Sequence, residues 1–545
     1  MMKLKPLLLV LLIGIVMHAK ADDYPRNYNI DIKHYAFRLG LSDANDSIIG
    51  STSITAMFMA DGVQSLRLDF ANATTQRAGK GMHVSTVALQ DGTPLSFTHQ
   101  DDVLLIRLPK PSVKGMQSVI VVEYRGVPAD GLRIGKTKYG NRSFFNENWP
   151  NRTRHWLPTV DHPYDKATSE FIVDAPTKYK VVSNGLLMEE SQLGNGFTKT
   201  HWKQQVPVSS WLFVLGVAEF AMQHVDWFEG KAIQTWVYPQ DREKGFADFA
   251  SPSKETLAFL SAYVGPYVYE KLANIQSPSV GGGMETSSAI FYAENLVDGK
   301  KSVRLRNVVI HEIAHQWFGN AVTESTWDDA WLSEGITTYF TLLFQEYAYG
   351  HAEYMDGLIR AKKSVYDYSK KDSTFSIVSN RTAEKEPVTS GITYQKGAWV
   401  LHMLRERIGN ENFRKGIRAY YAKYLNANAT TDDFIREMEM ASGQDLKVFF
   451  AQWLNRPENP KLNIRWTYDA SAKQVVVDVS QIQSGFRDFR FPLDVDIVGS
   501  DAANSKKVTV QVEQSQQRIL IPSEKKPFTL RFDPQTRLLA EIFTN

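Results

Sequence analysis

The 545-residue chain contains no cysteine. We therefore expect no disulfide bond and no lipid anchor on a cysteine, so burial of apolar side chains must hold the protein together. Apolar runs are also short, because the one strongly apolar stretch, residues 7–17, cannot span a bilayer. Neither sign of charge is in excess, with 62 basic against 60 acidic residues, and no basic stripe indicates a nucleic-acid partner. What remains is ordinary globular protein, with 43% hydrophobic and 22% charged residues.

The first 21 residues have the pattern of a secretory signal peptide. Lys3 and Lys5 precede the apolar run, and Ala19-Lys20-Ala21 supplies the small residues of a cleavage site. A buried N-terminal helix is the alternative, which this pattern disfavours. Cleavage would leave 59 basic and 60 acidic residues. We expect an exported, soluble protein without a membrane span, in a periplasm or outside the cell.

Length alone suggests three or four domains. From residue 22 to about 222 the sequence predicts short alternating strands, for example over 48–59, 103–108 and 118–124, with turns such as Asp61-Gly62 and Asp91-Gly92 between them. This pattern indicates an N-terminal β-sandwich or saddle-like sheet domain. The polar and aromatic loop 146–158 interrupts it, either as a connector or as a segment that reaches over to a functional site.

From about Val225 the pattern becomes helical, and residues 223–456 are expected to form a mainly helical domain. Helices are predicted over 253–263, with Ser251-Pro252 as cap and first-turn proline, and over 332–347, with a helix ending at Gly319-Asn320 between them. Three or four more helices follow between residues 396 and 454, with stops at Gly409 and Gly443.

Beyond Pro457 and Pro460 the pattern returns to strands, at 473–479, 491–498, 507–512, 518–521 and 528–532. These strands predict a small C-terminal β-sandwich over 457–545, about the size of an immunoglobulin-like module. The expected fold class is therefore a multidomain α+β protein.

The strongest functional signal is His311-Glu312-Ile313-Ala314-His315, followed by Glu334 after eighteen intervening residues. Two histidines four apart lie on one face of a helix, so their imidazoles can bind one metal ion. Glu334 on the next helix completes a three-ligand site, which leaves the fourth position for water as in a catalytic zinc site. Glu312 is placed to act on that water as general base. Core histidines satisfied by hydrogen bonds are the alternative, which the cost of burying three such groups without a ligand disfavours.

A second constellation is the glycine run that ends in Gly282-Gly283-Met284-Glu285. Glycines allow a backbone to approach a ligand closely, or allow an edge strand to pair with an extended peptide. Glu285 presents a further carboxylate, for which the α-ammonium group of a peptide is a suitable partner. Taken by itself, such a segment is usually only a turn.

Together these residues resemble the zinc aminopeptidases of the aminopeptidase N type, a family that includes leukotriene hydrolase. Its G-x-M-E-N motif corresponds to Gly282 through Glu285 and Thr286, and its third ligand lies in Trp331-Leu332-Ser333-Glu334-Gly335. The resemblance extends to the segment 392–398, where a tyrosine of the family hydrogen-bonds the tetrahedral oxyanion. It implies a thermolysin-like catalytic domain, one Zn²⁺ per chain held by His311, His315 and Glu334, and Tyr394 as a stabiliser of the oxyanion.

The sequence departs from the family pattern at several positions. Thr286 and Ser333 replace asparagines. Where the family usually places Gln or Glu, nine residues before Pro158, this chain has Trp149, with Glu147 or Asn148 as substitutes. The sequence ends after the β-sandwich, so we expect no large C-terminal helical domain and an active-site cleft that is open or closed by a second subunit.

The leading interpretation is a secreted zinc aminopeptidase, monomeric or dimeric, that acts on peptides with a free N-terminus. A zinc endopeptidase of the thermolysin type needs no amine anchor, so Glu285 distinguishes the two. An epoxide hydrolase of the leukotriene type would lack the helical domain that helps to bind its substrates. A catalytically idle binding scaffold would be expected to have lost ligands or base, yet His311, Glu312, His315, Glu334 and Tyr394 are all present.

Overall fold

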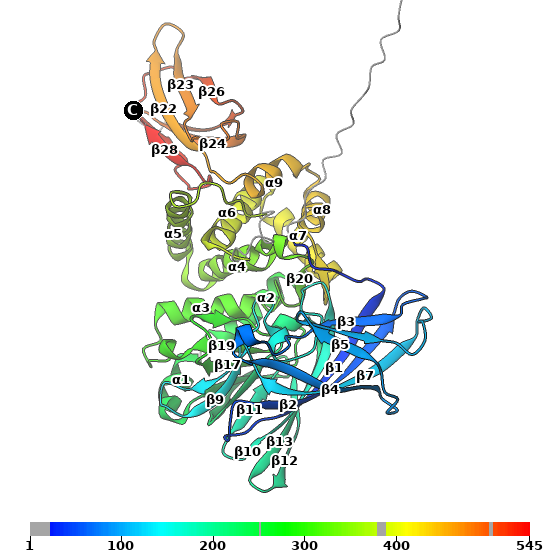
Figure 1. The fold of residues 1–545 in the computed structure, drawn as a ribbon. Coiled ribbons are helices and arrows are strands. Elements are labelled where there is room, and N and C mark those ends of the chain that lie inside the picture. Colours follow the sequence, from blue (N-terminus) through cyan, green and yellow to red (C-terminus); the bar gives the residue numbers. More distant parts are fainter. Residues whose placement is uncertain (1–21, 250–251, 379–387, 501–504, 545) are drawn as a thin grey trace, which may run out of the picture.

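The computed structural model describes residues 22–249, 252–378, 388–500 and 505–544. The segment predicted as a signal peptide lies outside these residues, as does Ser251. Figure 1 shows three tiers: β-sheets of the N-terminal half, a layer of helices in the middle, and a small pair of sheets at the C-terminal end. This agrees with the expected α+β fold class.

The N-terminal half is built on a seven-stranded sheet in the order β12-β13-β10-β1-β2-β7-β4. Buried and less buried residues alternate along its central strands, because one face of the sheet covers the core. Smaller sheets, β3-β6-β5 and β11-β14-β9-β8, accompany it. The bounds are β1 Ile30–Gly40, β2 Ile48–Phe58, β3 Ser65–Asp69, β4 Gly81–Leu89, β5 Phe97–Gln100, β6 Val103–Arg107, β7 Gln117–Val127, β8 Leu132–Lys136, β9 Arg142–Asn146, β10 Lys166–Pro176, β11 Lys180–Ser183, β12 Leu186–Gly194, β13 Phe197–Ser209 and β14 Leu215–Ala218.

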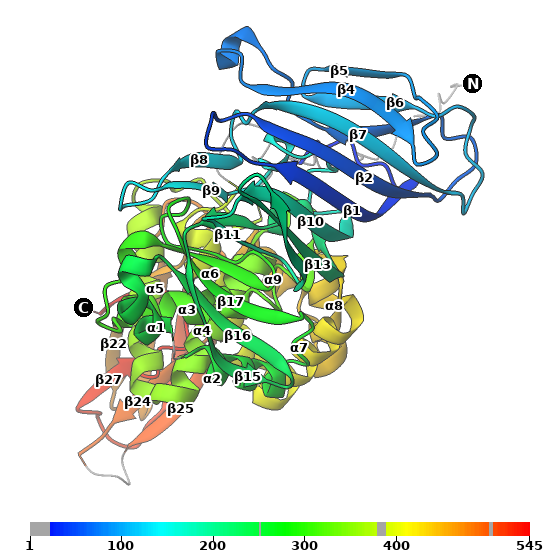
Figure 2. The ribbon, with the colours of Figure 1, turned by 90° about the horizontal axis from the view of Figure 1, so that it is seen from below.

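The chain after Val225 is mainly helical, as expected, but it also contains a sheet that the sequence analysis did not predict. A five-stranded sheet in the order β15-β16-β17-β19-β18 lies beneath the helices (Figure 2). Its strands are β15 Ala221–Phe228, β16 Lys231–Val237, β17 Lys271–Ser277, β18 Gly283–Met284 and β19 Ala289–Ala293. Every residue of β17 and β19 is buried, so these strands lack the alternation by which a half-buried strand is recognised.

The helical layer comprises α1 Arg242–Phe249, α2 Ser253–Tyr263, α3 Val303–Ala314, α4 Trp331–Tyr349, α5 His351–Ser369, α6 Gly391–Ile408, α7 Asn410–Tyr424, α8 Thr431–Ser442 and α9 Lys447–Leu454. Gly409 and Gly443 lie at helix ends as predicted, and α5 was not predicted. Pro252 occupies the N-cap position of α2, not its first turn. The metal-motif helix ends at Ala314 and not at Gly319-Asn320, because the next residues form tighter turns.

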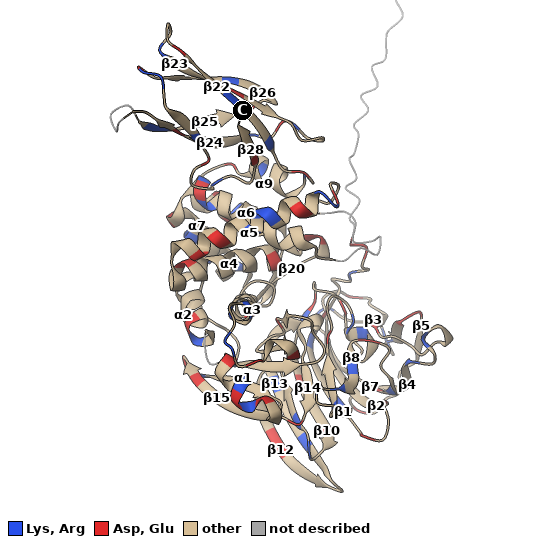
Figure 3. Ribbon diagram, turned by 90° about the vertical axis from the view of Figure 1, so that its left-hand side faces the viewer, with Lys and Arg blue, Asp and Glu red and all other residues tan. Residues whose placement is uncertain are grey.

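The C-terminal residues form two small sheets, β26-β23-β22-β28 and β25-β24-β27. Their strands are β22 Lys461–Asp469, β23 Gln474–Gln481, β24 Phe491–Val498, β25 Lys506–Val512, β26 Gln516–Pro522, β27 Thr529–Phe532 and β28 Glu541–Thr544. Acidic and basic residues are interspersed over the whole molecule in Figure 3. None of the helices formed by the described residues has both the length and the apolar character needed to cross a membrane.

The N-terminal sheets meet the helical layer at a pair of titratable residues, one partly and one fully buried. Lys166 of β10 donates to the carbonyl oxygens of Asn320 and Ala321 at 2.9 and 3.0 Å. Glu324, at the end of β20 (Val322–Glu324), is buried nearby, and neither of its carboxylate oxygens has a hydrogen-bond partner among the described residues. Burial raises the pKa of Glu324 to about 8, against an ordinary value of 4.5.

This raised pKa predicts a loss of stability as the pH rises from about 5 to about 8, because Glu324 ionises more readily in the unfolded chain than in the folded one. Glutamine does not ionise, so Glu324→Gln should remove this pH dependence. Between pH 5 and pH 8, we expect the free energy of unfolding to fall by at least about 1 kcal/mol less in the variant than in the wild type. Urea unfolding at several pH values measures the difference. Parallel pH profiles for the two proteins would contradict the prediction.

Candidate metal centre and active site

The two histidines of the motif face each other at the end of α3. Nε2 of His311 lies 3.1 Å from Nε2 of His315. The Oε2 atom of Glu334, in the first turn of α4, lies 3.1 Å from Nε2 of His315 and 3.5 Å from Nε2 of His311. That oxygen is buried and accepts no well-aligned hydrogen bond. Two imidazole nitrogens and one carboxylate oxygen lie within 4.8 Å of one another, so they could hold a metal ion, and this donor set suits zinc.

The neighbours of His315 fix the direction of its ring. Its Nδ1 atom lies 3.0 Å from the carbonyl oxygen of Phe318, and the hydroxyls of Ser333 and Thr337 lie 3.2 and 3.1 Å from the same nitrogen. A proton on Nδ1 donated to the carbonyl leaves the Nε2 lone pair free for a metal. The sequence at Ser333 departs from the family pattern, yet its hydroxyl remains in contact with a candidate ligand.

A close approach of two helices brings Tyr394 to the site. A Cβ atom at Gly335 of α4 would lie 2.9 Å from Cα of Gly397 in α6, so glycine is needed at this crossing. The Tyr394 hydroxyl on α6 donates to Oε1 of Glu334 at 2.6 Å. Burial and the charge of Glu334 raise the pKa of Tyr394, which keeps the phenol protonated as a hydrogen-bond donor.

The glycine segment forms the opposite wall. Gly283 and Met284 make up β18, the edge strand of the five-stranded sheet, where Gly283 pairs with Tyr292. A Cβ at Gly283 would lie 2.2 Å from Oε1 of Glu312, so any larger residue here would have to displace that side chain. The edge of β18 is a place where the backbone of an extended peptide can pair.

Glu285 follows directly and is also buried. Its carbonyl oxygen accepts hydrogen bonds from the side-chain amides of Gln316 and Asn320, at 2.9 and 2.6 Å. These two residues, just beyond the metal motif, fix the position of the segment. Ligand atoms of Glu285, Glu312 and His315 lie within 4.8 Å of one another, so all the carboxylates of the site converge.

This concentration of carboxylates dominates the electrostatics of the site. Burial raises the pKa of Glu285 to about 7, and burial together with the neighbouring Glu285 raises the pKa of Glu312. Burial opposes ionisation of Glu334, but His315 and His311 hold its pKa at about 2. Burial would lower the pKa of His315, yet the surrounding carboxylates raise it to about 10. Such an excess of negative charge suits a bound divalent cation together with a substrate ammonium group.

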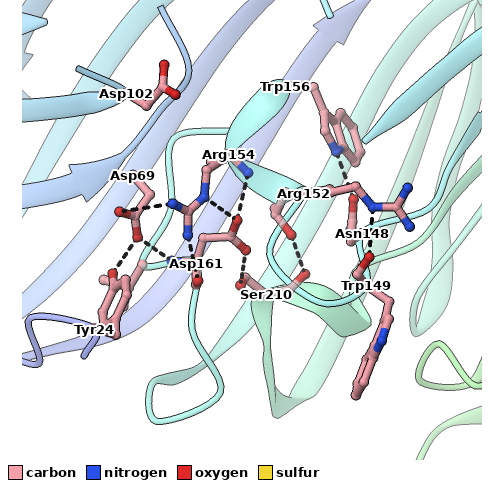
Figure 4. Close-up of polar contacts among 12 residues, drawn as sticks. Tyr24, Asp69, Asp102, Asn148, Trp149, Arg152, Arg154, Trp156, Asp161 and Ser210 are labelled. Atoms are coloured by element: carbon pink, nitrogen blue, oxygen red, sulfur yellow. Dashed lines mark hydrogen bonds and ion pairs between the residues drawn. The ribbon is translucent and has the colours of Figure 1, made fainter. Parts of the chain in front are cut away.

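The aromatic loop 146–158 does reach the catalytic half of the chain, through the contact of Trp149 with Trp327. Polar contacts within the loop are drawn in Figure 4. Trp149 packs edge-on against Trp211 and against Trp327, with ring centroids 4.8 Å apart in each pair, and Trp327 lies just before α4. Glu147 pairs with Arg152 and accepts a hydrogen bond from the Trp149 amide. Asn148 accepts a hydrogen bond from the Trp156 indole and donates to a main-chain carbonyl.

The side chains of Glu147 and Asn148 are thus engaged within the N-terminal region in this structure. Arg154 anchors the same loop through Asp161, with 3.0 Å between Nε and Oδ2. The hydroxyl of Ser210 donates to the other oxygen of Asp161, which is fully buried. Since burial of this network fixes the loop, Trp149 is held in the aromatic cluster.

Two sequence profiles of one family match the chain. The profile of the "Peptidase family M1 domain" matches residues 251–453, and that of the "Peptidase M1 N-terminal domain" matches residues 25–212. The chain belongs to peptidase family M1. This confirms the family resemblance found in the motifs, and the two M1 regions together cover more than half of the chain.

Relatives of the M1 chain include the glutamyl aminopeptidase of Sus scrofa, 32% identical over 344 residues that cover 60% of this chain and 36% of the relative. Aminopeptidase M1-A of Oryza sativa is 27% identical over 401 residues, 69% of this chain and 45% of the relative. The match therefore spans less than half the length of either relative. A solved M1 zinc metallopeptidase mutant from Deinococcus radiodurans has a TM-score of 0.66 at 22% identity, covering 79% of this chain and 96% of that chain. That likeness establishes the M1 fold.

All nine residues proposed from the sequence lie in this one region of the M1 fold: His311, Glu312, His315, Glu334, Tyr394, Gly282, Gly283, Met284 and Glu285. Sequence reasoning missed Gln316 and Asn320, which hold the carbonyl of Glu285. A signal was present, because Glu312, Gln316 and Asn320 follow one another at intervals of four. Thr337 was also missed, and nothing in the local sequence distinguishes it from other helical threonines.

Proposed function

We propose that this protein is a zinc aminopeptidase that removes the N-terminal residue from peptides. The observation that carries the proposal is the convergence of three ligand atoms from His311, His315 and Glu334, beside a buried Glu285 that is not needed as a ligand. His311, His315 and Glu334 would hold one zinc ion. When bound, zinc polarises the scissile carbonyl and lowers the pKa of water.

The other residues have distinct roles in this proposal. Glu312 accepts a proton from the attacking water and passes it to the leaving amine as general base and then acid. The Tyr394 hydroxyl donates a hydrogen bond to the oxyanion that develops on the carbonyl. The edge of β18, at Gly283 and Met284, pairs with the backbone of the peptide.

Glu285 makes the enzyme an exopeptidase by geometry. Its carboxylate binds the α-ammonium group of the substrate, so that only the first peptide bond reaches the metal. A thermolysin-type endopeptidase would not need this anchor, and the glutamate would then be a buried charge without a function.

We further propose that the protein is exported, as residues 1–21 suggest, and that it works as a monomer or a dimer. Its functional units would be the N-terminal β domain over 22–222, the catalytic domain over 223–456 and the β-sandwich over 457–545.

The decisive test is hydrolysis of amide-linked reporters from a panel of single amino acids, with free and with acetylated N-termini. We expect release from free aminoacyl reporters, and loss of that release on acetylation or chelation, because acetylation removes the positive charge that Glu285 binds. Activity that persists on acetylated substrates would overturn the exopeptidase assignment and favour the endopeptidase. The Glu285→Ala variant is the matched control, since it should lose activity on free reporters without a new activity on acetylated ones.

A further inference from the structure

The catalytic residues form one end of a larger cavity of about 440 Å³. Gly283, His311, Glu312 and Tyr394 line it, together with further residues of α3, α4 and α5. Glu285 does not line it. If Glu285 binds the amine of the first substrate residue, the cavity lies on the other side of the scissile bond, where the leaving part of the peptide must be held.

Two arginines line this cavity at positions exposed to solvent. Arg304 is on α3, seven residues before His311, and Arg360 is on α5. Among the described residues neither guanidinium has a hydrogen-bond or ion-pair partner. Arg306, two residues along α3 from Arg304, is by contrast paired with Glu353 at 2.8 Å and does not line the cavity. The cavity thus holds two cations that are not paired with any acidic side chain of the described residues, although Glu312 also lines it.

Apart from the residues named above, the lining is uncharged and carries several polar side chains beside apolar ones. Asn307, Thr338, Thr341 and Gln345 contribute to it. Gln345 is 2% exposed, yet its side-chain oxygen has no hydrogen-bond partner among the described residues. A buried acceptor without a partner costs free energy unless a donor arrives, and the N–H of a bound peptide is such a donor.

We propose that Arg304 and Arg360 bind a carboxylate on the leaving side of the substrate, so that this enzyme favours peptides with an anionic group just beyond the cleaved bond. This inference rests on the proposed aminopeptidase function. Guanidinium groups bind carboxylates through paired, charge-assisted hydrogen bonds, and among the described residues Glu312 is the one acidic side chain that lines the cavity. The carboxylate can be the C-terminus of a dipeptide or the side chain of an acidic second residue.

The test compares matched substrates that share the best first residue, X. One pair is the dipeptide X-Gly and its C-terminal amide; the other is X-Glu-amide and X-Gln-amide. We expect the wild type to have a higher kcat/KM for the anionic member of at least one pair, and that pair identifies the source of the carboxylate. For that pair, we define the substrate ratio as kcat/KM for the anionic member divided by kcat/KM for the neutral member. We expect this ratio to fall about tenfold in Arg304→Gln and in Arg360→Gln, and further in the double variant.

Lys363→Gln is the matched control, because Lys363 is an exposed cation on α5, one turn beyond Arg360, that does not line the cavity. Its substrate ratio should equal that of the wild type. Ratios near one for both pairs in the wild type, or ratios unchanged in the double variant, would overturn the inference while leaving the aminopeptidase function intact.

Binding provides a readout that does not depend on turnover. Calorimetry of X-Gly and its amide on the zinc-loaded Glu312→Gln protein should show tighter binding of the free acid, and Arg304→Gln added to that background should remove the difference. If no reporter is hydrolysed at all, the proposed function fails, and the calorimetric comparison still decides whether the arginines bind a carboxylate.

Discussion

Glu312→Gln is expected to lower kcat by about 10²- to 10⁴-fold while zinc remains bound, because the variant loses only the group that accepts the proton of the attacking water. Glu312 is buried against Gly283, with its carboxylate near those of Glu285 and Glu334, and it does not belong to the ligand set of His311, His315 and Glu334. Glutamine has nearly the same shape and removes a charge from a site that is already rich in carboxylates. The fold should therefore tolerate the change.

Steady-state kinetics on the best aminoacyl reporter, together with elemental analysis of the purified protein, separates the two possible effects. Glu437→Gln serves as the control, since Glu437 on α8 is buried to a similar degree but is paired with Lys423. A Glu312→Gln protein that holds one zinc and keeps kcat within tenfold of the wild type would show that another group accepts the proton. Loss of zinc would instead assign Glu312 to the metal site itself.

The residues that we propose as zinc ligands, general base and amine anchor could be singled out from the sequence because their chemistry depends on short spacings. Two histidines four residues apart must lie on one helical face, and Glu334 then needs only a second helix beside the first. The structure brings these groups together within 4.8 Å. The end of α3 was predicted wrongly, but the error lies beyond His315 and does not affect the face that the histidines share.

The remainder of the site depends on contacts between elements far apart in the chain. The sheet formed by β15–β19 was missed because its central strands are buried on both faces and show no alternation. The approach of Gly335 to Gly397, which brings Tyr394 to Glu334, is a tertiary contact that neither glycine reveals by itself. Helix α5, which carries Arg360, had a signal in the spacing of its buried residues Tyr354, Leu358, Ala361 and Val365.

Trp149 shows a different limit of the sequence. Its position in the loop could be counted from Pro158, but its partners, Trp211 and Trp327, come from two other parts of the chain. Glu147 and Asn148 are chemically suitable as replacements for an amine anchor, and only the structure reveals that Arg152 and Trp156 engage them. A residue type indicates what a side chain can do, whereas its packing determines whether that capacity is available.

Removal of zinc is expected to abolish hydrolysis and to lower the thermal unfolding midpoint, with both effects reversed by added zinc. A ligand that binds only the folded state stabilises it by about 4 kcal/mol when present at about a thousand times its Kd. Oε2 of Glu334 and the two Nε2 atoms converge with no well-aligned hydrogen bond to that oxygen, so a bound cation would satisfy all three atoms at once. The stabilisation should therefore be confined to proteins with an intact ligand set.

Thermal unfolding of the chelated protein with and without added zinc measures this effect, and His315→Ala provides the sharpest comparison. That variant loses the ligand whose Nδ1 is oriented by Phe318, so its midpoint should not respond to zinc. His351→Ala should respond as the wild type does, because His351 is an exposed histidine of α5 paired with Glu346. A zinc response of equal size in His315→Ala would mean that the ion stabilises the protein elsewhere, and the ligand assignment would then have to be abandoned even if chelation still abolished activity.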